Sequence, residues 1–255
     1  MPVYNPRPLG YTQFIRSTAP APFIQYDKPD IAICWMDLLG VRQMPHAQIT
    51  AAVDIALNSA AEASSNGGVT GNGILIGTPN SAVQYSLVGD ALVLTEKDMP
   101  NTRAAAKLAF LYRINILSRL LNERGLLHRG VITTGEVKCL VYEGSSIITG
   151  AGVVTAANLE GNLKTAGLFY DETWVRFIQL RQQQVDNQNF VAPFSAIPNW
   201  NAGAHAPNLA GVCFTQFEGW DHWKNMVNAG VQTNNKVANA QTLIQELKNT
   251  YGSLP

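Results

Sequence analysis

The chain has 255 residues, enough for one large domain with its own core, and only 14% of them are charged, against about 25% in typical soluble domains. The 18 basic and 18 acidic residues cancel, which excludes a global positive field that would attract nucleic acid or an anionic membrane. Three cysteines without metal-ligand spacing favour a reducing compartment, and no run of about 18 apolar residues predicts a membrane span. We therefore expect a cytoplasmic protein with neither nucleic acid nor a membrane as partner.

The first elements of the chain are an arm, a strand and a helix. Residues 1–29 are rich in proline and lack periodicity, so we expect an irregular arm. The apolar run Ile31–Leu39 predicts a strand buried on both faces. Apolar residues at helical spacing from Ile49 to Ala60 then predict an amphipathic helix.

A hairpin and a second helix are expected next. Two apolar runs, Gly73–Gly77 and Val83–Glu96, are separated by the turn-like Thr78–Asn80, which predicts an antiparallel hairpin. Helical spacing continues over residues 102–124, and Gly125 stands where a C-cap glycine belongs.

The following elements complete a recognisable order. Leu126–Val141 predicts a strand, Ala151–Lys164 a helix and Gly167–Tyr170 a short strand. Together the elements run β-α-β-β-α-β with additions, which is the order of a ferredoxin-like split βαβ sheet. The predicted fold class is therefore α+β, with a core over residues 30–172.

Residues 173–255 are expected to form a C-terminal extension that packs on this core. It begins with a polar helix, and the Asn-, Pro- and Ala-rich segment 185–211 then predicts a long loop, of the kind that is usually functional or wraps a neighbour. A terminal helix is indicated by one apolar face, made of Val237, Ala240, Ile244, Leu247 and Tyr251.

Two aspartates stand in apolar surroundings. Asp37 lies near the end of the first predicted strand, and Asp90 lies in a second apolar run beside Gly89, a residue that would let backbone or ligand approach closely. The predicted topology makes these strands neighbours, and two carboxylates brought together repel unless a divalent cation such as Mg²⁺ or Mn²⁺ bridges them. Alternatively, Asp37 caps a turn and Asp90 is a hairpin residue bound to backbone amides.

Five segments of the chain resemble, in the same order, the motifs of class III nucleotide cyclases. Trp35–Gly40 resembles their first-strand motif, an aspartate followed by two residues and a glycine, and Val88–Val93 resembles their second metal motif. The likeness is greatest to the bacterial pyrimidine cyclases of the Pycsar anti-phage system. Three further segments are similar to that subgroup: His128–Gly135, Gly150–Glu160 and Ala166–Asp171.

The resemblance implies metal-dependent cyclisation of a nucleoside triphosphate to the 3′,5′-cyclic monophosphate, with release of pyrophosphate. Two divalent ions, Mn²⁺ or Mg²⁺, would be held by Asp37, Asp90 and the Leu38 carbonyl oxygen. Arg129, on the same predicted sheet, could hold the triphosphate or be an ordinary ion-pair arginine, and with Gly40 it makes up the predicted nucleotide-binding residues. The resemblance also implies a homodimer with sites shared between subunits, and a second messenger that activates a separate effector during anti-phage defence.

Departures from the family bear on the substrate. General purine cyclases carry a lysine four residues before the second aspartate, where this chain has Ser86. They also carry an asparagine and an arginine on the late helix, where this chain has Val154 and Asn158. Both differences favour a pyrimidine substrate, UTP ahead of CTP. The alternatives are a cytidylate cyclase, or a catalytically inactive nucleotide-sensing or dimerisation module of the same fold.

Overall fold

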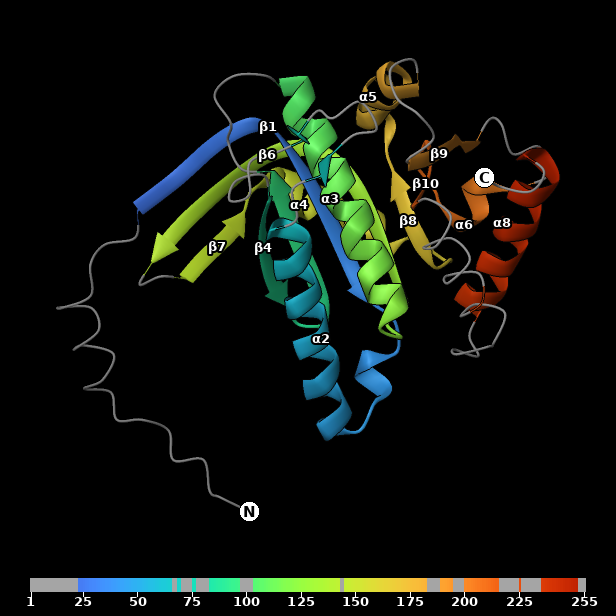
Figure 1. The fold of residues 1–255 in the computed structure, drawn as a ribbon, viewed down its shortest axis with the longest axis horizontal. Helices are drawn as coiled ribbons and strands as arrows, with labels where there is room; N and C mark the ends of the chain where they lie inside the picture. The colour runs from blue at the N-terminus through green and yellow to red at the C-terminus, as the bar shows by residue number, and fades with distance from the viewer. Residues whose placement is uncertain are drawn as a thin grey trace.

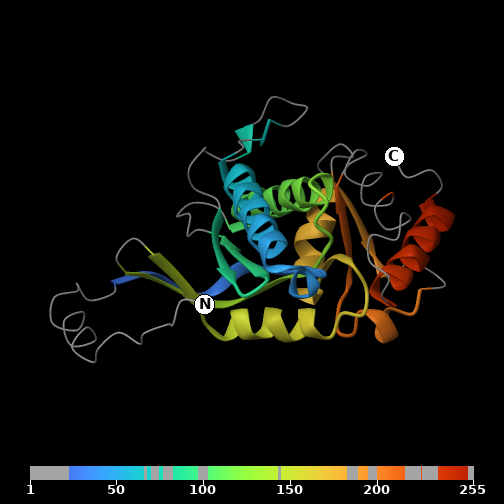
Figure 2. The ribbon, with the colours of Figure 1, turned by 90° about the horizontal axis from the view of Figure 1, so that it is seen from below.

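The computed structural model describes residues 23–65, 68–69, 75–76, 83–96, 103–142, 145–182, 189–194, 200–215, 225 and 235–251. In this part, one large mixed sheet carries helices on both of its faces (Figures 1 and 2). None of the helices in these ranges combines the length and apolar character needed to cross a bilayer.

The strands are β1 (Phe23–Leu38), β2 (Gly68–Val69), β3 (Leu75–Ile76), β4 (Val83–Val88), β5 (Ala91–Glu96), β6 (His128–Tyr142), β7 (Ser145–Thr149), β8 (Gly167–Tyr170), β9 (Asn189–Pro193) and β10 (Gly211–Thr215). The helices are η1 (Val41–Gln43), α2 (His46–Ser65), α3 (Arg103–Glu123), α4 (Ala151–Gly161), α5 (Glu172–Gln182), α6 (Ala202–His205) and α8 (Asn235–Tyr251).

The predicted α+β, ferredoxin-like arrangement is confirmed by the strand order. Four strands lie in the order β4-β5-β1-β6, and each neighbouring pair among them is antiparallel. With α2 between β1 and β4 and α3 between β5 and β6, this is the βαββαβ sheet in which the first strand lies between the third and the fourth. β8 then joins β6 in parallel, and β10 and β9 extend the sheet beyond it.

The predicted hairpin is wrong in its position. Residues 83–96 form both strands of the hairpin, β4 and β5, joined by the two-residue turn Gly89–Asp90, whereas β3 pairs with β2 in a separate small sheet. The predicted turn, Thr78–Asn80, lies outside the described residues. Gly89 has a φ of 65°, and no atom lies within 4 Å of a Cβ placed on it. The left-handed backbone explains this glycine, and no described part of the protein approaches it closely.

β1 begins earlier than predicted, because its pairing with β6 extends back to Phe23. Residues 23–29 belong to this strand and not to the predicted arm 1–29, whose first 22 residues lie outside the described part. The pairing of β1 with β6 shifts register between Lys28 and Ile31. This irregularity contains Pro29, a residue that strands accommodate at bulges because it lacks an N–H.

From Ile31 onward, both faces of β1 carry buried residues, as the apolar run Ile31–Leu39 predicts. One face packs under α2 and α3, and Figure 2 shows α4 on the opposite side of the sheet. The first face carries Ala32, Cys34, Met36 and Leu38. The second carries Ile31 and Ile33, which share a cluster with Val153 and Ala156 of α4.

α4 lies against the sheet at two glycines. A Cβ placed on Gly135 of β6 would lie 2.7 Å from the Gly152 Cα of α4. A Cβ on Gly152 would lie 2.5 Å from Ile33 Cδ1 and 2.9 Å from the Glu136 carbonyl oxygen. Because no side chain fits there, the two glycines set how closely α4 approaches β6.

The C-terminal extension contributes strands to the sheet, which corrects the prediction of a continuous loop over 185–211. β9 and the start of β10 fall inside that segment and pair with each other next to β8. The terminal helix α8 is present as predicted, and its buried residues pack against Val131, Phe169 and Val212 of the sheet. Four residues of its predicted apolar face are buried, Val237, Ala240, Ile244 and Leu247, while the Tyr251 side chain lies outside the description.

A group of charges lies between α3 and the sheet, and we call it the Lys107 cluster. It includes the Asp30 carboxylate, which is 40% exposed and lies 3.5 Å from the Lys107 ammonium. The Lys107 side chain is 1% exposed, and its ammonium lies 3.5 Å from Glu96 Oε2 and 3.1 Å from the Asp30 carbonyl oxygen, to which it donates. Glu96 also accepts a hydrogen bond of 3.0 Å from the Ala32 amide. The Phe177 ring lies 5.5 Å from the Lys107 ammonium.

Candidate functional site

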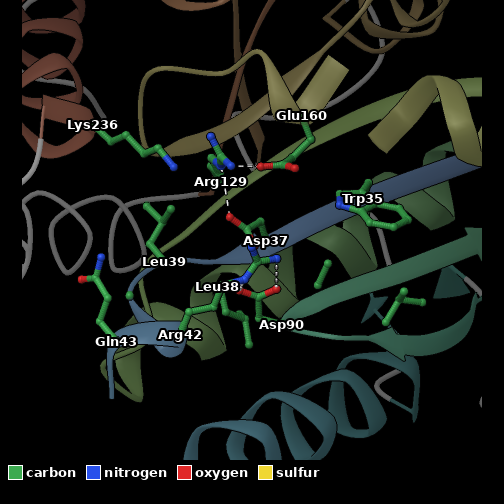
Figure 3. Close-up of a pocket in the computed structure, with 13 residues that line it drawn as sticks. Trp35, Asp37, Leu38, Leu39, Arg42, Gln43, Asp90, Arg129, Glu160 and Lys236 are labelled. Atoms are coloured by element: carbon green, nitrogen blue, oxygen red, sulfur yellow. Dashed lines mark hydrogen bonds and ion pairs between the residues drawn. The ribbon is translucent and has the colours of Figure 1, made fainter. Parts of the chain in front are cut away.

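A cavity of about 280 Å³ opens where β1 ends, beside the β4–β5 turn (Figure 3). All five site residues predicted from the sequence line it: Asp37, Leu38, Gly40, Asp90 and Arg129. Three further charged residues, Arg42, Glu160 and Lys236, also line it. The cavity thus collects three carboxylates and three cations from the sheet, η1, α4 and α8.

The two aspartates are brought together by the register of β1 and β5. Asp37 is paired with Ala91, the residue after Asp90, and the Leu38 amide donates a hydrogen bond of 3.0 Å to the Asp90 carbonyl oxygen. Burial raises the pKa of Asp37; the Arg129 charge opposes this rise, and the Asp90 charge adds to it. Asp37 is therefore held above its ordinary pKa, in part by the second carboxylate.

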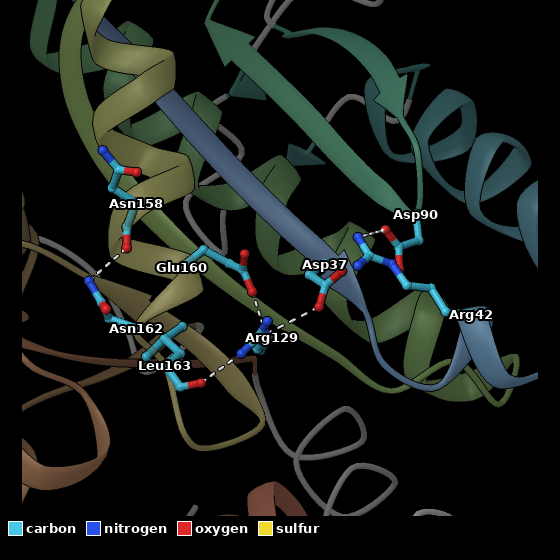
Figure 4. A network of polar contacts seen from close by, with 8 residues as sticks. All are labelled: Asp37, Arg42, Asp90, Arg129, Asn158, Glu160, Asn162 and Leu163. Carbon is cyan, nitrogen blue, oxygen red and sulfur yellow. Dashed lines mark hydrogen bonds and ion pairs between the residues drawn. The ribbon is translucent and has the colours of Figure 1, made fainter.

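Arg42 forms a two-pronged ion pair with Asp90 (Figure 4). Its Nε lies 2.6 Å from Oδ2, and its Nη2 donates to Oδ1 at 2.7 Å. The Arg42 side chain is 81% exposed, whereas that of Asp90 is 11% exposed. The hydrogen bonds and charge of Asp90 raise the pKa of Arg42.

Arg129 connects the other two carboxylates (Figure 4). Its Nε lies 3.2 Å from Asp37 Oδ2 and also forms an ion pair with Glu160, while its Nη1 donates to the Leu163 carbonyl oxygen at 2.7 Å. Burial raises the pKa of Glu160 to about 7; the Arg129 charge opposes the rise and the Asp37 charge adds to it. Arg129 is thus an ion-pair arginine inside the cavity, and both interpretations of this residue remain compatible with its position.

Lys236 reaches the cavity from the first turn of α8. Its carbonyl oxygen accepts from the Ala166 amide at 3.3 Å, which ties this end of α8 to the loop before β8. Burial lowers the pKa of Lys236, and the Arg129 charge lowers it further. Among the described residues, no carboxylate forms an ion pair with Lys236, unlike Arg42 and Arg129. Its sequence context, a polar helix start, gives no signal that would have identified it.

The residues that distinguish this chain from purine cyclases lie outside the cavity lining. Ser86 is half-buried within β4. Val154 is 61% exposed, and Asn158 is also exposed, both on α4. Glu160, by contrast, belongs to one of the five motifs, although the sequence alone assigns it no role.

The carboxylates of the cavity suit a hard divalent cation. Asp37 and Asp90 offer oxygen ligands from adjoining backbone positions, and the Leu38 peptide lies beside them. No group of three or more His, Cys, Asp or Glu side chains arranged to hold a metal ion is present in the described ranges. In the structure both carboxylates are bound by arginines, Asp90 by Arg42 and Asp37 by Arg129.

No protein-family model and no curated protein matches the sequence. Among solved structures, the chain is similar to the monomeric guanylyl cyclase domain of the RhoGC fusion protein from the aquatic fungus Blastocladiella emersonii, with 14% identity, a TM-score of 0.47, and coverage of 67% of this chain and 93% of that one. A non-canonical dimeric form of that domain gives 12% identity, a TM-score of 0.47, and coverage of 75% and 98%. A bacterial light-regulated adenylyl cyclase gives 14%, 0.41, and coverage of 84% and 59%.

Proposed function

We propose that this chain is a metal-dependent nucleoside triphosphate cyclase that forms a 3′,5′-cyclic monophosphate and pyrophosphate. The observation that carries the proposal is the meeting of Asp37 and Asp90 in one cavity with Arg42, Arg129 and Lys236. Two carboxylates for divalent ions, beside several cations, match what a triphosphate with its metal ions requires. The same two aspartates stand in the motifs that resemble those of class III cyclases.

In this mechanism the residues of the chain position the substrate and balance its charge. Asp37, Asp90 and the Leu38 carbonyl oxygen would hold two divalent ions, Mn²⁺ or Mg²⁺. When bound, such ions lower the pKa of the ribose 3′-hydroxyl and neutralise charge on the α-phosphate and the leaving pyrophosphate. The 3′-hydroxyl gives its proton to solvent water, the 3′-oxygen attacks the α-phosphorus in line, and the bond to the pyrophosphate oxygen breaks.

The triphosphate is assigned to the cations and backbone at the end of β1. Lys236 has no ion-pair partner among the described residues, so its charge is available to phosphate oxygens. Gly40 has a φ of 83° and lines the cavity without a side chain. Arg129 holds Asp37 and Glu160 in place, and its Nη2 is the guanidinium nitrogen for which no protein partner is found in the described ranges.

For the base, we propose a pyrimidine, UTP ahead of CTP. Ser86 stands where purine cyclases direct a lysine at the base, and this short side chain offers no comparable charged donor. A site lacking that donor leaves polar groups of a purine unpaired, which discriminates against it.

We further propose a cytoplasmic homodimer with shared sites, whose cyclic nucleotide activates a separate effector in anti-phage defence. The resemblance to class III cyclases supports the dimer, and the low share of charged residues, 14%, leaves little repulsion against association. Sedimentation at micromolar concentration tests it, and a monomer with activity linear in protein concentration would contradict shared sites.

The test of the activity is incubation of the purified chain with equimolar ATP, GTP, CTP and UTP and Mn²⁺, with products identified by mass spectrometry. Cyclic UMP with equal amounts of pyrophosphate is expected. Cyclic CMP would correct only the base, and a dominant cyclic purine nucleotide would overturn the pyrimidine assignment. Nucleotide binding without any cyclic product or pyrophosphate would favour the inactive nucleotide-sensing module.

A further inference from the structure

The ion pair between Arg42 and Asp90 occupies a carboxylate that the proposed function needs for a divalent ion. Both carboxylate oxygens of Asp90 contact the guanidinium, at 2.6 and 2.7 Å. A metal ion on the same carboxylate would face the guanidinium charge at close range. Arg42 and a divalent ion therefore compete for Asp90.

Of the two arginines bound to aspartates in the cavity, Arg42 is the one that can leave. Its side chain is 81% exposed, so water solvates the guanidinium as it moves away, and exposed ion pairs of this kind contribute little to stability. Arg129 is 14% exposed and is held by Asp37, Glu160 and the Leu163 carbonyl oxygen together. Removing Arg129 would leave two largely buried carboxylates without their cation.

The backbone around Arg42 can stay fixed during such a movement. The amides of Gln43 and Met44 donate to the carbonyl oxygens of Gly40 and Val41, at 3.0 and 3.1 Å, and the Val41 side chain is buried. Only the side chain of Arg42 has to rotate. It rotates from a position on the cavity lining, next to the open space in which the triphosphate is placed by the proposed function.

We propose that Arg42 is an exchangeable cation, which lies on Asp90 in the metal-free protein and binds the triphosphate once Asp90 holds a divalent ion. The inference rests on the proposed function for its ligands. It makes the binding of metal and nucleotide mutually supportive: the metal ion releases Arg42 for the phosphates, and the phosphates keep Arg42 away from Asp90. Linkage requires each ligand to raise the affinity for the other by the same factor.

The test is Mn²⁺ binding to the purified full chain, followed by electron paramagnetic resonance, with and without α,β-methylene-UTP, which cannot be cyclised. Arg42→Ala is compared with the wild type and with Arg119→Ala, an arginine on α3 that does not line the cavity. Without nucleotide, Arg42→Ala should bind Mn²⁺ roughly two- to fivefold more tightly, because an exposed competitor is gone. Its affinity for the analogue in the presence of Mn²⁺ should fall roughly ten- to a hundredfold.

A second variant separates charge from geometry. Arg42→Lys keeps the positive charge but lacks the fork, so it should compete with Mn²⁺ less than the wild type and more than Arg42→Ala. Melting temperatures close to the wild-type value verify that the exposed substitutions leave the fold intact.

The results distinguish the exchange from the proposed function. The exchange is overturned if Arg42→Ala binds Mn²⁺ more weakly than the wild type. It is also overturned if the factor by which each ligand raises the affinity for the other is the same in both proteins. Either result counts even if the wild type forms cyclic nucleotide. If the coupling of Mn²⁺ and nucleotide binding depends on Arg42 but the protein forms no cyclic nucleotide, the exchange is supported and the proposed cyclase activity is overturned. A wild type that binds neither Mn²⁺ nor the analogue overturns both.

Discussion

The Lys107 cluster and the cavity use the same kinds of side chain in opposite ways. In the cluster, a lysine that is 1% exposed lies against a glutamate that is 8% exposed, and the sheet and α3 exclude water from both. In the cavity, Asp90 is covered to a similar degree, but its partner Arg42 is 81% exposed. Removing one partner of a pair closed on both sides destabilises the fold, because the charge that remains cannot be resolvated. A pair closed on one side leaves a carboxylate that another cation can reach.

The largest effect is expected where the cavity loses a carboxylate. Asp37→Ala or Asp90→Ala should lower cyclic nucleotide formation by at least about a hundredfold, the scale on which transition-state electrostatics act. Each melting temperature should stay within about 4 °C of the wild type, because loss of either carboxylate also removes the repulsion between Asp37 and Asp90. Asp54→Ala on the exposed side of α2 is the matched control. Full turnover in either cavity variant would contradict the metal assignment.

Removal of divalent ions should abolish turnover without unfolding the protein. The hydrophobic clusters around the sheet contain none of the cavity carboxylates. A chelator therefore leaves these clusters intact. Product assays and circular dichroism before and after chelation, with Mn²⁺ restored at the end, measure the two properties separately. Unfolding on chelation would show that a metal ion is structural.

Substitutions in the Lys107 cluster should lower the stability of the protein and leave its turnover unchanged. Lys107→Met leaves the buried Glu96 charge unpaired and should cost about 3–5 kcal/mol of unfolding free energy in urea titrations. Adding Glu96→Gln should recover part of that loss, and turnover per folded molecule should stay unchanged in both variants. A cost below about 1 kcal/mol would show that the cluster is as open to water as the Arg42 pair.

The smallest effect concerns the pH dependence of stability. The folded pKa of Glu160 is about 7, above its ordinary value of 4.5. Between these values the unfolded chain has released a proton that the folded chain retains, so stability falls as pH rises and levels off above pH 7. The slope from this one group is at most about 1.4 kcal/mol per pH unit. In metal-free urea titrations from pH 4.5 to 8, the difference between wild-type and Glu160→Gln stability should show this slope, because buried His128, whose pKa is lowered to about 4, contributes equally to both proteins. Parallel curves would contradict the raised pKa of Glu160.

The sequence predicts the aspartates because a carboxylate in an apolar run is a local anomaly, although in the structure Asp90 lies in the β4–β5 turn. Asp37 and Asp90 therefore stand out without any knowledge of the fold. The hairpin is misplaced because Thr78–Asn80 has a stronger turn composition than Gly89–Asp90. The length of the run Val83–Glu96, fourteen residues against the five or six of a usual strand, is the signal that favours the turn actually formed.

The remaining parts of the site depend on long-range packing. Lys236 is more than a hundred residues from Arg129 in sequence, and only the docking of α8 on the sheet brings it to the cavity. β9 and β10 lie in or border a segment whose Asn- and Pro-rich composition is typical of loops, so edge pairing with β8 decides their structure. The residue pattern within these segments predicts neither the docking of α8 on the sheet nor the pairing of β10 with β8.

The glycine contact beneath α4 has a consequence for the cavity. The helix has 11 residues and is about 16 Å long, with Gly152 near its first turn and Glu160 at its last. Because the helix is rigid along its axis, a side chain at position 152 or 135 displaces the whole rod and carries the Glu160 carboxylate away from Arg129. A random mutational screen for lost turnover would thus return these two glycines together with the cavity residues, although neither of them lines the cavity.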